Sequence, residues 1–115
     1  MKLLTKAIKA KLPPISAGIA PGPSMFGKGG LHDAKFTCKF FDPMGSWTWY
    51  VLEGMEQPDG DWLFYGLVDG FEKEWGYFRL SDLERVQANI DFHTGIERDL
   101  YFSDVPVESV WPAST

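Results

Sequence analysis

From Ala34 onward, apolar and polar side chains alternate along the chain with the period of two that is typical of a β-strand. Short turn signals, among them Pro58-Asp59-Gly60 and Asp69-Gly70, separate successive stretches of this kind. Turns this short force neighbouring strands to run antiparallel. The pattern therefore predicts an antiparallel sheet whose first strand starts at Ala34 and whose later strands cover residues 47–52, 62–68, 75–80 and 97–102.

Two short helices are predicted outside this alternating pattern. Thr5 can cap a helix over Lys6–Lys11, because its hydroxyl can accept a hydrogen bond from an amide of the first turn. Pro13-Pro14 ends that helix, since the residue before a proline avoids helical angles. Ser81-Asp82-Leu83-Glu84 is typical of a capping box, and it predicts a second helix that runs to about Gln87.

These elements predict one α+β domain over residues 1–115, in which one or two short helices pack on one face of a four- or five-stranded antiparallel sheet. Residues 13–33 are rich in Gly, Pro and Ser and are predicted to form a surface loop. Within them, Gly27-Lys28-Gly29-Gly30 lacks the Ser or Thr, the preceding strand and the following helix of a phosphate-binding loop. Residues 105–115 are predicted to be a flexible tail.

The alternation assigns side chains to two faces of the sheet. One face, which the helices would cover, holds Phe36, Phe40, Trp49, Phe64 and Val68. We expect Trp49 and Phe64 to be largely buried there. Cys38 alternates with the phenylalanines of the first strand, so it is predicted to be a small core residue rather than a nucleophile.

The opposite face is the predicted binding surface. It would hold Lys39, Tyr50, Tyr65, Tyr77 and Arg79. Tyrosines near cations are typical of hot spots in protein interfaces and of stacking platforms for unpaired bases. The alternative is that the loop before Asp33 and the C-terminal tail simply cover this face.

Charge is distributed unevenly along the chain, whose net charge is −5. Residues 1–39 contain seven lysines and one acidic residue, whereas the rest contains four basic and fifteen acidic residues. Such a division indicates a charged partner, a self-complementary interface, or two halves that neutralise each other within the fold. An acidic body argues against duplex DNA as a partner, because phosphate neutralisation supplies most non-specific affinity.

Cysteine content and hydropathy bear on the compartment. Cys38 is the single cysteine, so no intrachain disulfide can form, and a reducing compartment is expected. No apolar run approaches the roughly 20 residues of a membrane span. The lysines in Met1–Lys6 interrupt what would be a secretory signal. We therefore expect a cytoplasmic protein with no membrane partner.

Glu97 and Asp99 would project to one face of the last predicted strand and Arg98 to the other. Two neighbouring carboxyl groups can form an acid/base pair if their pKa values are driven apart. The alternative, which we favour, is a structural ion pair between Arg98 and an acid on another segment, with Glu97 and Asp99 in water or capping a turn. Plausible partners for Arg98 are Asp69, Glu72 and Glu74.

No catalytic residue, metal site or cofactor is predicted. A metal site usually needs three or four ligands of suitable spacing, and His32 and His93 are two isolated histidines. No base lies near Ser46, Ser81 or Ser103 in the sequence.

Five ordered blocks resemble a small bacterial family, the domain-of-unknown-function family twenty-nine fifty-eight. The resemblance spans roughly residues 1–103, although residues 16–33 are richer in Gly and Pro than the family pattern. Its blocks are Leu3–Lys6 with Leu12–Pro14, Trp47–Tyr50, Phe64–Val68, Gly76–Phe78 with Leu80-Ser81, and Ile96–Phe102. The resemblance implies a context of plasmids, conjugative elements and phages, sometimes within larger polyvalent proteins, and it implies no activity.

The leading functional hypothesis is a non-enzymatic accessory of a mobile genetic element that binds a host or element protein, for counter-defence or to assist transfer. The alternative is a single-stranded nucleic-acid binder that uses the tyrosine face and the N-terminal lysines. A weaker alternative is an enzyme centred on Glu97 and Asp99.

Overall fold

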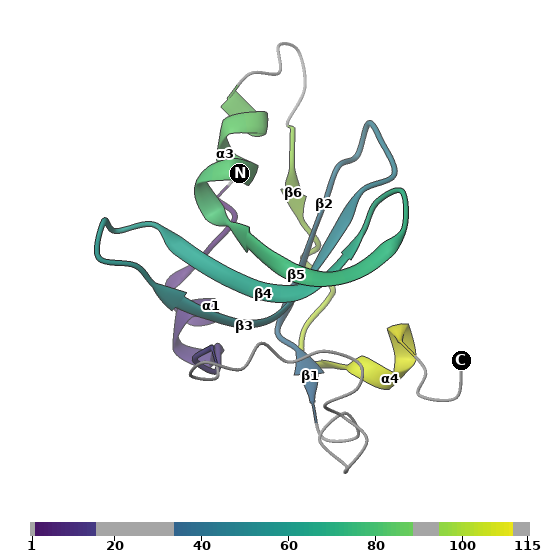
Figure 1. Cartoon of the computed structure of the whole chain (residues 1–115), viewed down its shortest axis with the longest axis horizontal. Coiled ribbons are helices and arrows are strands. Elements are labelled where there is room, and N and C mark those ends of the chain that lie inside the picture. Colours follow the sequence, from purple (N-terminus) through teal and green to yellow (C-terminus); the bar gives the residue numbers. More distant parts are fainter. Residues whose placement is uncertain (1, 16–33, 89–94, 112–115) are drawn as a thin grey trace.

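A five-stranded antiparallel sheet forms the centre of the protein in a computed structural model that describes residues 2–15, 34–88 and 95–111 (Figure 1). The strands lie in the order β5-β4-β3-β2-β6. They are β2 (Cys38–Phe41), β3 (Thr48–Glu56), β4 (Trp62–Asp69), β5 (Lys73–Arg79) and β6 (Glu97–Arg98). Two further strands, β1 (Lys35–Phe36) and β7 (Val105–Pro106), pair with each other outside this sheet. The predicted α+β class is confirmed.

Among the described residues, three short helices accompany the sheet: α1 (Lys6–Lys11), α3 (Leu80–Ala88) and α4 (Val107–Val110). Side chains of α1 and α3 pack against one face, whereas α4 packs against the other. Figure 1 shows α4 beside β1, on the other side of the sheet from α3. In the part of the chain that the structure describes, no helix is long and apolar enough to cross a bilayer.

The helix starts were predicted with mixed success. The Thr5 hydroxyl accepts a hydrogen bond from the Ile8 amide at 3.2 Å, so the predicted cap of α1 is confirmed. The predicted capping box at Ser81 is wrong. The Ser81 hydroxyl and amide instead donate to the two carboxylate oxygens of Asp61, at 2.6 and 3.1 Å. The carboxylate of Asp61, the residue before β4, thus takes the place that the capping box would give to Glu84.

The Asp61 carboxylate is held in its charged form by this arrangement. Burial alone would raise its pKa, but hydrogen bonds from Ser81, the Trp62 amide and Arg79 outweigh burial and lower the pKa below its ordinary value. Asp61 therefore fixes the start of α3 through a charge-assisted interaction between segments twenty residues apart.

β3 is longer than predicted because its pairing with β4 continues past an irregularity. The register shifts between Val51 and Glu53, the signature of a β-bulge. Gly66 lies opposite this point, and a Cβ there would clash with the Tyr50 carbonyl oxygen. The bulge therefore requires glycine at position 66. The last strand is shorter than predicted, since the Asp99 side chain accepts the Tyr101 amide in a turn that ends β6.

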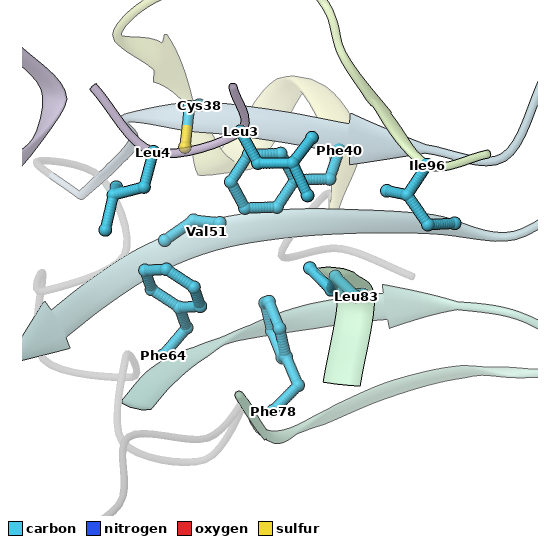
Figure 2. Close-up of a cluster of buried hydrophobic side chains, with 9 residues drawn as sticks. All are labelled: Leu3, Leu4, Cys38, Phe40, Val51, Phe64, Phe78, Leu83 and Ile96. Atoms are coloured by element: carbon cyan, nitrogen blue, oxygen red, sulfur yellow. The ribbon is translucent and has the colours of Figure 1, made fainter. Parts of the chain in front are cut away.

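The first hydrophobic cluster lies between the sheet, the N-terminal segment and α3 (Figure 2). Phe64 is at its centre, fully buried, with its ring 5.9 Å from that of Phe40 and 5.5 Å from that of Phe78. The predicted burial of Phe64 is confirmed, whereas Trp49 is half-buried at the margin. The cluster consists of Leu3, Leu4, Cys38, Phe40, Val51, Phe64, Phe78, Leu83 and Ile96.

Cys38 is a core residue, as predicted. Its side chain is 1% exposed and lies among Leu3, Leu4 and Val51 in Figure 2. Burial raises the pKa of the thiol to about 12, against smaller opposing effects of Arg98 and Lys11. The thiol is therefore protonated and inaccessible in the folded protein.

The second hydrophobic cluster covers the opposite face and consists of Phe36, Leu52, Tyr65, Leu67 and Val107. The prediction that Phe36 shares a face with Phe40 is wrong. Thr37 lies between β1 and β2 and belongs to neither strand, and its amide donates to the Val51 carbonyl. The alternation of side chains between the two faces therefore does not continue from Phe36 to Cys38. Residues 105–110, expected to be part of a flexible tail, instead form β7 and α4 and supply Val107 to this cluster.

Candidate functional site

Two of the five predicted binding residues, Lys39 and Tyr50, lie together on the second-cluster face. They are directly opposite each other on β2 and β3. The Lys39 ammonium lies 5.8 Å from the Tyr50 ring and 5.5 Å from the Phe102 ring, and 3.3 Å from the Asp99 carboxylate. The Tyr50 ring also packs against Phe36 at 5.3 Å. Lys39 therefore already has a carboxylate and two aromatic rings as partners.

Tyr65 does not lie on an open face, and that expectation is wrong. Its side chain is only 4% exposed, between Trp75 at 6.0 Å and Tyr77 at 4.9 Å. Burial, with smaller effects of Tyr77 and Glu53, raises the pKa of its hydroxyl to about 12. Tyr77 is half exposed and lines a hollow of about 720 Å³ with Met55 and Leu63. Of the three tyrosines predicted to be exposed, Tyr77 is therefore the one with a largely exposed ring.

Arg79 and Arg98 both have structural partners. The Arg79 guanidinium lies 3.5 Å from the Asp61 carboxylate. Arg98 donates to the main-chain carbonyls of Lys2 and Leu3 at 2.6 and 3.1 Å, which ties the N-terminal segment to β6. The predicted partners Asp69, Glu72 and Glu74 lie on the β4–β5 hairpin, at the far side of the sheet from β6, so pairing with them is wrong.

Glu97 and Asp99 line a small hollow of about 260 Å³, together with Phe41 and Tyr101. Asp99 is committed to other groups, because it binds the Lys39 ammonium and accepts the Tyr101 amide at 2.9 Å. It therefore caps a turn, which is one of the two roles foreseen for these acids.

The most exposed aromatic ring of the sheet's hairpins, that of Phe71, is not among the predicted binding residues. Phe71 lies in the tight turn between β4 and β5 and is 94% exposed. Its ring stands edge-on to Trp47 at 5.4 Å, and Trp47 in turn lies 6.0 Å from Trp49. A Cβ on Gly70 would come within 2.5 Å of the Trp47 ring. The absence of a side chain at Gly70 thus allows the Trp47 indole to pack directly against the turn and to contact the Phe71 ring.

The rings of Phe71 and Trp47 belong to a hollow of about 290 Å³ that we call the hairpin surface. Its members are Trp47, Val68, Phe71, Glu72 and Glu74. Both glutamates are exposed, and no ion pair between described residues includes either of them. The hairpin surface therefore combines an aromatic wall with two uncompensated negative charges. A phenylalanine directly after the Asp69-Gly70 turn was the sequence signal that could have indicated it.

The histidines lie outside the described residues, as does the Gly27–Gly30 segment. Within the described ranges, no three side chains of the His, Cys, Asp or Glu type gather where they could hold a metal ion.

Comparison with known proteins gives one match. A family model described as "Protein of unknown function (DUF2958)" matches residues 23–114. No curated protein and no solved structure matches the chain. The match confirms the resemblance drawn from the sequence blocks between Trp47 and Phe102. Because it covers most of the sequence, the chain belongs to the family of proteins of unknown function DUF2958.

Proposed function

We propose that the protein is a non-enzymatic accessory of a mobile genetic element, such as a plasmid, conjugative element or phage, and that it acts by binding another protein. The observation that carries the binding role is Phe71, a ring 94% exposed and supported from beneath by Trp47. Exposed aromatic side chains held in a fixed position are typical of interface hot spots. The mobile-element context is what the family resemblance implies, and counter-defence or assistance to transfer are the roles that fit it.

Charge favours a protein over nucleic acid as the partner. The carboxylates of Glu72 and Glu74 stand beside the exposed rings, and the net charge of the chain is −5. Phosphate groups would be repelled there, whereas arginine and lysine side chains would be attracted. Binding of single strands on the tyrosine face is less favoured, because the second cluster occupies that face. A single buried thiol is compatible with action in the cytoplasm.

The test is affinity capture from bacterial cells that carry the element, with and without nuclease. We expect Phe71→Ser to reduce the nuclease-resistant capture of a specific partner by about tenfold or more, as expected for the loss of a hot spot. Tyr101→Ser is the matched control, because Tyr101 is 99% exposed but lies outside the hairpin surface. Equal capture by both variants, or capture that nuclease abolishes, would contradict the proposal.

A further inference from the structure

Strand alternation separates the charged side chains at the start of β5 onto two sides of the sheet. Glu74 lies opposite Val68 in the register, so the two side chains share a face, and Val68 packs against the first cluster there. Lys73 projects to the other face. Its ammonium donates to the Val110 carbonyl at 3.4 Å, beside the second cluster. The lysine between Glu72 and Glu74 in the sequence therefore does not neutralise either of them.

The aromatic side of the hairpin surface is held in place by contact between two turns. The β2–β3 and β4–β5 turns lie side by side at one end of the sheet in Figure 1, and the Trp47 ring packs directly against Gly70. The Phe71 ring stands at 81° to that of Trp47, with 5.4 Å between the ring centroids. Two rings at nearly a right angle give the hollow aromatic walls of two orientations. The 94% exposure of Phe71 leaves its ring open to a partner.

The hollow thus offers aromatic rings and two carboxylates to one ligand. Glu72 and Glu74 are exposed, line the same hollow, and take part in no ion pair with a described residue. A ligand that uses both features must be cationic and able to stack on a ring. The guanidinium group of arginine meets both requirements, since it is planar and carries five N–H donors, whereas an ammonium group is a compact, strongly hydrated charge.

We propose that the hairpin surface binds an arginine side chain of the partner protein. This inference rests on the proposed function and specifies the residue by which the partner is recognised. The guanidinium stacks on the Phe71 ring, and its N–H groups donate to the carboxylates of Glu72 and Glu74. Arginine is enriched among interface hot spots, and hot spots tend to face one another across an interface, so an arginine opposite Phe71 is the pairing expected there.

The arginines of this chain are already engaged, which favours another protein over a second copy as the source of the guanidinium. Arginine occurs at positions 79, 85 and 98. Arg79 and Arg85 each lie 3.5 Å from a carboxylate of the same chain, and Arg98 donates to two main-chain carbonyls of the N-terminal segment. A second copy would have to give up one of these contacts to fill the hollow, whereas a partner with an unpaired arginine would not.

The probe is N-acetyl-arginine amide, titrated into the full chain while the tryptophan indole N–H signals are followed by NMR. We expect a saturable shift of the Trp47 signal with a dissociation constant in the millimolar range. Two matched compounds serve as controls. N-acetyl-citrulline amide keeps the shape of arginine without its charge, and N-acetyl-lysine amide keeps the charge without the planar group. Each should bind about fivefold more weakly or worse.

Variants of the full chain test the carboxylates. Glu72→Gln with Glu74→Gln should weaken binding of the arginine probe about tenfold, a difference of about 1.4 kcal/mol. The control pair Glu56→Gln with Glu84→Gln removes the same charge from exposed positions outside the hairpin surface and should change binding little.

Partner capture separates this inference from the proposed function. Glu72→Gln with Glu74→Gln should reduce capture of the partner as Phe71→Ser does. Full capture by the glutamine variant, together with loss of capture in Phe71→Ser, would overturn the arginine site and leave the proposed function intact. Full capture by Phe71→Ser would instead contradict the proposed function itself.

Four results of the titration would also overturn the inference. The first is the absence of a saturable Trp47 shift at about 50 mM arginine probe, well above a millimolar dissociation constant. Equal binding of the citrulline probe would show that charge is not recognised, and equal binding of the lysine probe would show that the planar group is not. The last is a Trp47 shift that grows with protein concentration alone, which would assign the hollow to a second copy.

Discussion

The two faces of the sheet bury side chains of different character. The first cluster, on the side of α1 and α3, is made of aliphatic side chains, phenylalanines and Cys38. None of its buried side chains carries a hydroxyl, amide or charged group. The second cluster includes Tyr65, is flanked by Tyr50 and Trp75, and is covered by the C-terminal segment that contains Val107. A tyrosine can thus be a core residue on one face of a sheet, because its ring is apolar even though its hydroxyl is polar.

The largest expected effect lies in the first cluster. Phe64→Ala should lower the free energy of unfolding by about 3–5 kcal/mol, since it opens a cavity among fully buried neighbours. Urea denaturation followed by tryptophan fluorescence measures this. Tyr65→Phe is the matched control on the next residue and the opposite face, and it should cost far less because it preserves the ring. A similar loss in both variants would mean that the two clusters do not differ in this way.

A smaller effect is expected where the C-terminal segment covers the second cluster. Val107 is fully buried, and Val107→Ala removes two methyl groups from contact, so it should cost about 1–2 kcal/mol. Hydrogen exchange should then quicken in residues 105–111 before it quickens in β3 and β4, because local opening follows local loss of buried contact. Uniform acceleration over the whole sheet would indicate that the second cluster is an integral part of a single core.

The smallest effect concerns the carboxylate that fixes α3 over the first cluster. Asp61→Asn should cost about 1 kcal/mol at neutral pH, because Asn supplies one acceptor in place of a charged carboxylate. The folded state lowers the pKa of Asp61, so its contribution is complete above the unfolded pKa and is lost as pH falls through the lowered folded value. The difference from wild type should therefore shrink below about pH 4. Thermal unfolding across pH measures it, and a constant difference would contradict the assignment.

The sequence pattern located the five strands of the sheet and the helices α1 and α3, but it did not indicate β7 and α4 and did not assign every side chain to the correct face. Period-two alternation and turn signals locate the strands because they depend on local geometry. They do not show which face holds Phe36, because the irregular residue Thr37 places Phe36 on the other face from Phe40. Asp61 as the partner of Ser81 could not be predicted either, because the pairing joins the residue before β4 to the first turn of α3 and depends on the register of β4 with β5.

The candidate site was predicted less well than the fold. Tyrosines were predicted to form the binding surface, but Tyr65 is buried and Tyr50 is partly buried among aromatic neighbours and the C-terminal segment. Phe71 carries a detectable signal, an apolar residue in a tight turn. The contact of Trp47 with Gly70, which holds the aromatic wall in place, joins two hairpins and needs the three-dimensional arrangement.

The rate at which the Cys38 thiol is labelled reports how often the folded protein opens around it. Cys38 is the single thiol, it lies beneath the N-terminal residues Leu3 and Leu4, and its pKa of about 12 leaves almost no reactive thiolate. A thiol reagent can therefore modify the native protein only when the structure around Cys38 opens locally. The labelling rate therefore measures the frequency of this local opening. The hydrogen bonds from Arg98 to the Lys2 and Leu3 carbonyls hold the N-terminal segment on the sheet and lower that frequency.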